Sequence, residues 1–194
     1  MSTPLRLLSV DARSLGRDRA ALSRVITAAG CDVVCVHGGP HLPRWRAITA
    51  EVARRAGLVV VTGGRPAGAN LLLSTLGVDV AAVQDLRLPG GSRLAAPGAA
   101  LGALRLRGTD FVLGCATLTG DAPERRAQAR KLRAAIDTLV PGDPPPIVSV
   151  EGAESPFLDG LIAVADGLFV DARITVGGLD KAEHGVRAEL VVSP

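Results

Sequence analysis

Hydrophobic positions in the first third of the chain follow two alternating spacings. Leu5–Val10 and Val33–His37 are short runs of mostly apolar residues, as found in strands that are buried on both faces. After each run, apolar residues recur every three or four positions, which is typical of an amphipathic helix. These helices are expected over Arg17–Ala29, which Gly30 would end, and over Arg44–Ala56. The pattern predicts two successive strand–helix units.

The rest of the chain consists mainly of short β-rich segments separated by Gly- and Pro-rich turns. Asp121 and Pro123 provide a cap and a first turn for one further helix, Glu124–Leu139. A short helix is also expected from Ser155 through Ile162. The predicted strands are Leu58–Thr62, Asn70–Ser74, Val78–Leu88, Ala99–Arg107, Asp110–Thr117, Ile147–Val150, Gly167–Val170, Arg173–Val176 and Arg187–Val192.

This order of elements predicts a mixed α/β fold. Strands and helices alternate first and strands dominate later, which favours two β-sheets with helices on their outer faces. The 194 residues are 47% hydrophobic, enough for a substantial core, and they contain no internal repeat and no dividing linker. We therefore expect a single domain over residues 1–194.

Composition narrows the choice of partners. One Trp, three Phe and no Tyr leave little aromatic surface for stacking on single-stranded bases. The 22 basic and 19 acidic residues are scattered along the chain, so the net charge of +3 indicates no particular partner and gives nucleic acid no support. No apolar run is long enough to span a bilayer, and the N-terminus lacks a signal-peptide pattern. We expect a cytoplasmic protein with no membrane partner.

Two local clusters have both a chemical and a structural interpretation. The three cysteines are Cys31, Cys35 and Cys115. They read as reduced core thiols, although the first two could bind zinc together with His37 and His41. Gly63–Gly68 is glycine-rich and contains an arginine, so it could cradle a phosphate or simply connect two strands. We favour the structural interpretation in both cases.

Two strings near the N-terminus resemble those of a known superfamily. Leu8–Arg13 reads Leu-Ser-Val-Asp-Ala-Arg, and Asp32–Gly38 reads Asp-Val-Val-Cys-Val-His-Gly. In the endonuclease/exonuclease/phosphatase superfamily, the matching strands end in Asn and in Asp-Val-Val-x-Leu-Gln-Glu. These proteins are Mg²⁺-dependent phosphodiesterases and phosphatases. The resemblance implies their DNase I-like fold, a four-layer α/β sandwich of two mixed or antiparallel sheets with outer helices.

The resemblance continues through most of the chain. The family string Gly-Thr-His-Leu-Asp is similar to Cys115–Thr119, and Gly-Asp-x-Asn is similar to Val150–Ala153. Arg-Ile-Asp-x-x-Phe-Val is similar to Val164–Val170, and Ser-Asp-His is similar to Ala182–His184. The resemblance thereby assigns roles to seven residues. The implied catalytic residues are His184, Glu183 and Asp166, the implied metal ligands are Asp11 and Glu151, and the implied substrate contacts are Thr117 and Asn70.

The departures from the family pattern fall on these functional positions. Gly38 replaces a metal-binding Glu, Thr117 replaces a His that contacts phosphate, and Ala153 replaces an Asn that orients the nucleophile or substrate. Asp11 replaces Asn, and glutamates replace aspartates at 151 and 183. Each longer Glu displaces its oxygens by about one methylene, whereas Mg²⁺ requires near-ideal octahedral ligation.

Two functional hypotheses follow. The leading one is a pseudoenzyme that keeps the scaffold, needs no cofactor, and binds a phosphate-containing small molecule or a partner protein. The alternative is an active Mg²⁺- or Mn²⁺-dependent phosphoester hydrolase with a rebuilt carboxylate site, in which His184 acts as general base. Under the first hypothesis His184 is a residue at the end of a loop, and Asp11 caps the turn that follows its strand.

Overall fold

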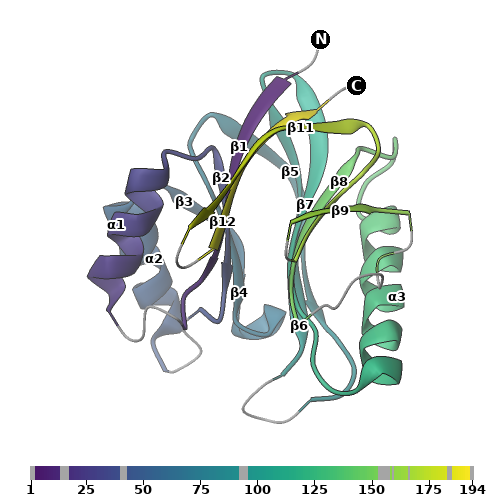
Figure 1. Cartoon of the computed structure of the whole chain (residues 1–194). Coiled ribbons are helices and arrows are strands. Elements are labelled where there is room, and N and C mark those ends of the chain that lie inside the picture. The colour runs from purple at the N-terminus through teal and green to yellow at the C-terminus, as the bar shows by residue number, and fades with distance from the viewer. Residues whose placement is uncertain are drawn as a thin grey trace.

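The computed structural model describes residues 3–13, 18–39, 43–91, 96–152, 158, 160–165, 167–182 and 185–192. Two six-stranded sheets face each other, and helices cover their outer faces (Figure 1). The first sheet contains, in spatial order, β11 (Ile174–Ala182), β12 (Gly185–Val192), β1 (Thr3–Asp11), β2 (Val33–His37), β4 (Asn70–Ser74) and β3 (Val59–Gly64). The second contains β5 (Val78–Arg87), β6 (Gly98–Leu106), β7 (Thr109–Thr117), β8 (Pro146–Glu151), β10 (Leu168–Val170) and β9 (Ile162–Ala165).

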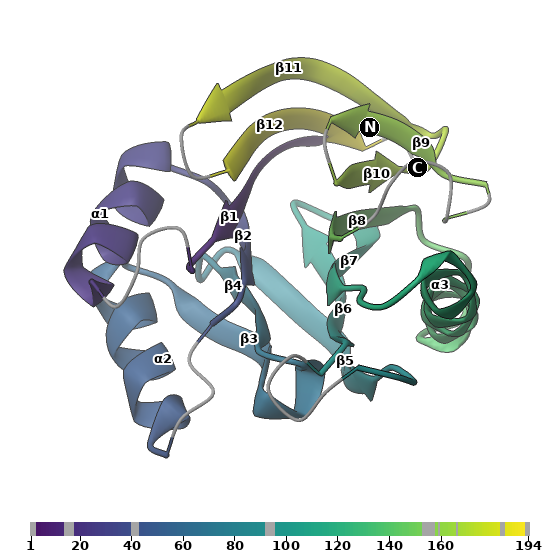
Figure 2. The ribbon, with the colours of Figure 1, turned by 60° about the horizontal axis from the view of Figure 1, so that its bottom comes forward.

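In the described part of the chain, three α-helices complete the layers. Helices α1 (Arg19–Ala29) and α2 (Trp45–Arg55) lie on the first sheet, and α3 (Ala122–Thr138) lies on the second (Figure 2). A 3₁₀ turn, η1 (Arg65–Ala67), joins β3 to β4, so the glycine-rich segment is a connection between strands as expected, except that its first residues, Gly63 and Gly64, end β3. The result is a four-layer arrangement of helix, sheet, sheet and helix. The two-sheet α/β architecture predicted from the sequence is confirmed.

Both sheets are mixed and contain a parallel pair near their centre. Strands β1 and β2 are parallel, as are β7 and β8, and the other pairings described are antiparallel. A parallel pair needs a crossover connection, which α1 supplies in the first sheet and α3 in the second. The carboxyl ends of all four strands therefore reach the same end of the sandwich, at the bottom of Figure 1.

Aliphatic side chains fill three interior layers. One buried cluster lies between the sheets, a second lies under α3, and a third lies under α1 and α2. Because the central strands are covered on both faces, every residue of β2 and β4 is buried. This explains why these strands read as continuous apolar runs in the sequence.

Two helix ends agree with the capping residues expected from the sequence, Asp121 and Gly30. Asp121 accepts a hydrogen bond from the backbone N–H of Glu124, whose side chain accepts one from the backbone N–H of Asp121. Helix α1 is capped by Asp18 and ends at Gly30, which has φ of 58°. In the described part of the chain, no helix combines the length and apolar character needed to cross a membrane.

Two predicted segments differ from the structure. Strand β11 was expected to stop at Val176 before two glycines, but a register shift between Val176 and Gly178 lets it continue to Ala182. The predicted helix from Ser155 through Ile162 falls mostly outside the described residues, and Ile162 instead begins β9, which pairs with β10. The predicted helix is therefore wrong at its last residue, Ile162, which belongs to a strand.

Candidate functional site

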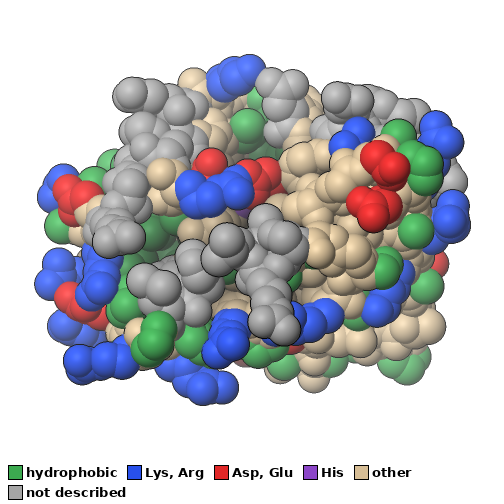
Figure 3. Space-filling view, turned by 90° about the horizontal axis from the view of Figure 1, so that it is seen from below, with side chains coloured by type: hydrophobic (Ala, Val, Ile, Leu, Met, Phe, Trp, Pro, Cys, Tyr) green, Lys and Arg blue, Asp and Glu red, His purple; other side chains and the backbone are tan. Residues whose placement is uncertain are grey.

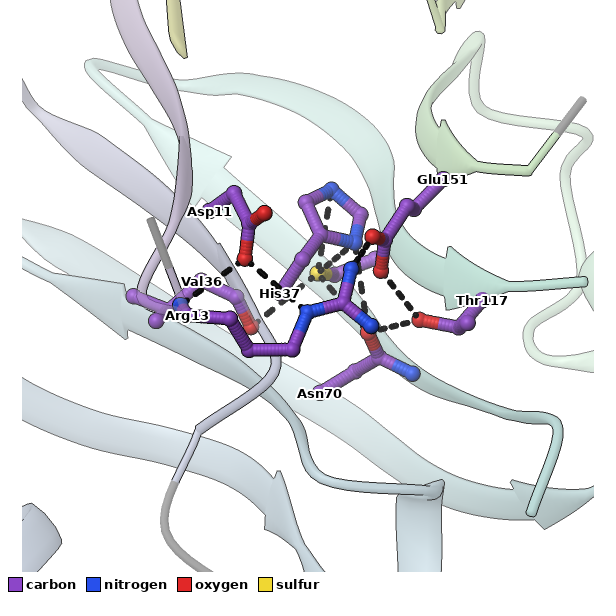
Figure 4. A network of polar contacts seen from close by, with 8 residues as sticks. Asp11, Arg13, Val36, His37, Asn70, Thr117 and Glu151 are labelled. Atoms are coloured by element: carbon purple, nitrogen blue, oxygen red, sulfur yellow. Dashed lines mark hydrogen bonds and ion pairs between the residues drawn. The ribbon is translucent and has the colours of Figure 1, made fainter. Parts of the chain in front are cut away.

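Polar side chains from both sheets meet where the central strands end. Asp11 and His37 are register partners at the ends of β1 and β2. Thr117 and Glu151 are register partners at the ends of β7 and β8. Asn70 begins β4, which runs antiparallel to β2 and so starts at the same end of the sandwich. Strand direction alone therefore gathers five polar residues at one place (Figure 4).

At the surface, the guanidinium of Arg13 bridges Asp11 and Glu151. Its Nε donates to Asp11 Oδ1 at 3.2 Å, and its Nη2 forms an ion pair with Glu151 Oε1. The backbone N–H of Arg13 also donates to Asp11 Oδ1 at 2.9 Å, which orients this carboxylate toward the guanidinium. The Arg13 side chain is 54% exposed and that of Glu151 is 26% exposed. These three residues are called the mouth below; Figure 3 shows acidic and basic side chains meeting at this end of the molecule.

Gly38, directly after β2, leaves the space that the Arg13 side chain occupies. Its φ of 63° lies in the left-handed region that favours glycine. A Cβ at this position would lie 2.6 Å from Arg13 Cδ and 2.8 Å from Arg13 Nε, closer than non-bonded atoms approach. A larger residue at position 38 would therefore require the arginine to move.

Beneath the mouth, Thr117 and Asn70 link the two sheets. Thr117 Oγ1 lies 2.9 Å from Asn70 Oδ1 and 3.3 Å from Glu151 Oε2, so one hydroxyl proton serves two acceptors. Asn70 Nδ2 donates to the backbone oxygens of Ala67 at 2.8 Å and Gly98 at 3.0 Å, which fixes the orientation of the amide. Asn70 is fully buried, and all its bonding capacity is used within the protein.

His37 continues this set of bonds into the interior. Its Nδ1 lies 3.2 Å from Asn70 Oδ1, which can only accept, so Nδ1 carries the proton. Burial lowers the pKa of His37 to about 4, although the hydrogen bond that His37 donates to Asn70 opposes this shift. The neutral ring therefore uses Nε2 to accept from Ser149 Oγ at 2.7 Å. Ser149 Oγ in turn accepts from Ser9 Oγ at 2.6 Å, between the two sheets.

Five polar side chains are linked by hydrogen bonds into one series between the two sheets. We call them the buried network; its members are Ser9, Ser149, His37, Asn70 and Thr117. Because each hydroxyl proton and ring nitrogen has an assigned partner, the series has a single donor direction along most of its length. It ends at Glu151, where it meets the mouth.

The cysteines are buried and not bonded to one another, which confirms their interpretation as core thiols. Cys35 and Cys115 donate to backbone oxygens of the facing sheet, Gly114 at 3.7 Å and Val36 at 3.6 Å. Burial raises the pKa of Cys115 well above its ordinary value, so this thiol keeps its proton. His37, the last residue of β2, is also buried and only 4% exposed. Among the described residues, no group of three metal-binding side chains forms; His41 lies outside them.

The structure brings together four of the seven residues to which the resemblance assigned roles. Asp11, Glu151, Thr117 and Asn70 share the site, and their assigned metal and substrate roles stay predictions. Asp166, Glu183 and His184 lie outside the described residues, as does Ala153. No role was assigned from the sequence to Arg13 or Ser149, and His37 was considered only as a possible zinc ligand. The signal was present for Arg13, because it lies two positions after Asp11 in the first family-like string.

The described residues do not fit a divalent metal ion as they stand. Mg²⁺ requires hard oxygen ligands in near-octahedral order. Asp11 and Glu151 each direct an oxygen at the Arg13 guanidinium, and Gly38 contributes no side-chain oxygen. A cation placed between the two carboxylates would meet the positive charge of Arg13.

Comparisons with known proteins show which solved structures share this fold. No protein-family model matches the sequence, and no curated protein sequence matches it either. A solved endonuclease/exonuclease/phosphatase family protein from Bacteroides thetaiotaomicron superimposes with a TM-score of 0.74 at 12% identity, covering 100% of both chains.

Two further solved structures are similar over nearly their whole length. The human Nocturnin catalytic domain with bound sulfate has a TM-score of 0.70 at 14% identity, covering 98% of this chain and 96% of that one. A mannosyl-6-phosphatase from Bacteroides thetaiotaomicron has a TM-score of 0.71 at 11% identity, covering 97% and 100%. The chain therefore has the DNase I-like fold of the endonuclease/exonuclease/phosphatase proteins, as the sequence resemblance implied.

Proposed function

We propose that this chain is a pseudoenzyme on the endonuclease/exonuclease/phosphatase fold, which binds a phosphate-containing ligand at its mouth and does not hydrolyse it. The observation that carries the proposal is the pairing of polar groups at the strand ends. Both ring nitrogens of His37 are bonded inside the protein, and both carboxylates of the mouth face Arg13.

Hydrolysis needs a group that removes a proton from water and a cation that stabilises the negative charge on the oxygens of the phosphoryl group. The neutral His37 accepts from Ser149 with its only unprotonated nitrogen and is buried beneath Thr117 and Asn70. Asp11 and Glu151 are held by a guanidinium. The described residues thus offer a binding surface and no evident base.

The guanidinium of Arg13 is the group best suited to phosphate. Its Nη1 carries two N–H groups that have no partner among the described residues, and the side chain is more than half exposed. Arginine offers a planar pair of donors that matches two phosphate oxygens. Two similar structures favour an oxyanion on this fold: the Nocturnin domain was solved with bound sulfate, and the mannosyl-6-phosphatase is named for a phosphate ester.

The charges at the mouth require phosphate to replace one of the carboxylates that already contact Arg13. Two carboxylates already face one guanidinium, so an arriving phosphate is repelled unless one carboxylate leaves. Glu151 is the one to leave, because Asp11 is also fixed by the backbone N–H of Arg13. The proposed ligand therefore replaces Glu151 on the guanidinium. The other ligand class expected from the sequence, a partner protein, stays a prediction.

The test combines binding and hydrolysis with one phosphomonoester probe. Mannose 6-phosphate is titrated by calorimetry into the wild type, into Arg13→Gln, and into Arg19→Gln as a control. Arg19 is similarly exposed and pairs with Glu51 on the outer helices, away from the mouth. Heat of binding should appear in the wild type and the control and be lost in Arg13→Gln.

Released inorganic phosphate is measured in parallel with Mg²⁺ and with Mn²⁺. We expect none above the buffer rate. Turnover that requires the metal and is lost in both Asp11→Asn and Glu151→Gln would overturn the proposal in favour of the hydrolase hypothesis. Absence of binding in the wild type would overturn the choice of phosphate.

A further inference from the structure

The two carboxylates of the mouth come from different sheets and need a positive charge between them. Asp11 ends β1 in the first sheet, and Glu151 ends β8 in the second. Like charges brought together at the end of a sandwich repel one another unless a cation lies between them. The cation that lies there is the guanidinium of Arg13, which contacts one oxygen of each (Figure 4).

The position of Arg13 depends on Gly38. The arginine side chain runs across the end of β2 through the space above this glycine, where any Cβ would collide with Arg13 Cδ and Nε. The left-handed backbone at Gly38 also disfavours larger residues. A glycine at 38 and an arginine at 13 are therefore complementary, because the first provides the room that the second fills.

We infer that Arg13 is the built-in cation of this site: its guanidinium holds the place between Asp11 and Glu151 that a divalent metal ion would otherwise take. The chain thereby supplies the charge that the two carboxylates require, and the folded protein gains nothing from a metal at this point. Removal of the guanidinium leaves two facing carboxylates, a pair of hard oxygen donors suited to Mn²⁺ or Mg²⁺.

This inference does not depend on the proposed function. It concerns the cation between the carboxylates in the protein without a ligand, and it holds whether or not a phosphate is able to replace Glu151 on the guanidinium. The experiments are separated accordingly, since the one below uses metal ions alone in a buffer free of phosphate. A failure of phosphate binding leaves its result unchanged.

The test measures the melting temperature with 5 mM EDTA and with about 1 mM Mn²⁺ or Mg²⁺. The variants are Arg13→Ala, Arg13→Ala combined with Gly38→Glu, and Arg13→Lys, which keeps a positive charge. Arg19→Ala is the control for loss of an exposed arginine. The wild type, Arg13→Lys and the control should be indifferent to both ions. Arg13→Ala should gain several degrees in Mn²⁺, and the double variant, with a third carboxylate, should gain at least as much.

Binding is confirmed by the loss of the free Mn²⁺ signal in electron paramagnetic resonance, which is recorded at low temperature so that a destabilised variant stays folded. Arg13→Gln, which preserves most of the side-chain volume, serves if Arg13→Ala does not fold. Mn²⁺ binding by the wild type that Asp11→Asn abolishes would overturn the inference. So would an Arg13→Ala variant, or its Gln equivalent, that binds no more Mn²⁺ than the wild type.

Discussion

The mouth and the buried network lie next to each other at the same strand ends, yet their polar groups differ in burial and in pairing. In the buried network, His37 is 4% exposed, Asn70 is fully buried, and each has a partner for its bonding groups. At the mouth, Arg13 is 54% exposed and keeps donors without a described partner. Burial therefore divides one continuous set of bonds into a structural part and a part that is able to meet a ligand.

The structural part joins the two sheets. Asn70 in the first sheet bonds Thr117 and the backbone of Gly98 in the second, and His37 bonds Ser149. Polar groups in such a position specify how the sheets face each other, because any sliding would leave buried donors without acceptors. The mouth has no such constraint, since water can replace each of its bonds. We therefore expect substitutions in the buried network to lower the free energy of unfolding, and substitutions at the mouth to change phosphate binding with little effect on stability.

The largest effect is expected for Asn70→Ala. It leaves the backbone oxygens of Ala67 and Gly98 and the Nδ1–H of His37 without partners in a buried place. With about 1–3 kcal/mol for each buried unsatisfied group, partly relieved by relaxation, the free energy of unfolding should fall by about 3–5 kcal/mol. Urea denaturation measures this free energy. The control is Asp85→Asn, which alters the exposed bond to Thr62. If Asn70→Ala lowers the free energy of unfolding no more than this control does, the buried network does not hold the sheets together.

The next effect concerns pH. Because the folded-state pKa of His37 is lowered to about 4, the unfolded chain binds a proton at higher pH than the folded one. The contribution of neutral His37 to the free energy of unfolding is fully present above pH 6.5. It is lost progressively as pH falls toward 4, and the total loss is about 3 kcal/mol. His37→Gln, with an amide that does not titrate, should flatten the stability profile in this window. An equally steep profile in the variant would mean that another group is responsible.

A smaller effect is expected at the mouth. Glu151→Gln removes the carboxylate that competes with phosphate for Arg13, so mannose 6-phosphate should bind up to about tenfold more tightly, a gain of about 1.4 kcal/mol. Calorimetry at constant ionic strength measures this change. The metal-dependent hydrolase hypothesis predicts the reverse, because the variant would lose a metal ligand. Weaker binding in Glu151→Gln would contradict the exchange that we propose.

The smallest effect is expected on stability at the mouth. Arg13→Gln removes two ion-pair contacts of an exposed side chain, which water and salt already screen. The free energy of unfolding should fall by less than about 1 kcal/mol, while phosphate binding is lost. Urea denaturation of this variant beside Asn70→Ala gives the contrast directly. A loss as large as that of Asn70→Ala would remove the distinction between the two regions.

Much of the fold could be predicted because the central strands are buried on both faces. Val33–His37 and Asn70–Ser74 read as continuous apolar or β-rich runs, and their observed bounds equal the predicted ones. The start of α3 could be predicted from the sequence, because Asp121 is a residue type that commonly caps helices. Strand β9 was missed because its four residues are partly exposed and show no alternation. The continuation of β11 was missed because its two glycines read as a turn.

The site was harder to predict, because the residues that contact one another in it are distant in sequence. The resemblance identified Asp11, Thr117 and Glu151 at strand ends, and the parallel pairs bring them together. Arg13 was missed because an arginine in a polar segment reads as a solvated surface residue, and only the packing of the two sheets places it beside Glu151. His37 was predicted at the end of a strand, but its bonds to Asn70 and Ser149 could not be predicted, because these partners lie in other strands.

The central claim is that a guanidinium occupies the place between Asp11 and Glu151. The most direct measurement is the anomalous difference density of Mn²⁺ in crystals of the wild type soaked in MnCl₂. The account predicts density for Arg13 between the two carboxylates and no manganese peak there. A manganese peak at coordination distance from both carboxylates, with Arg13 turned away, would contradict it.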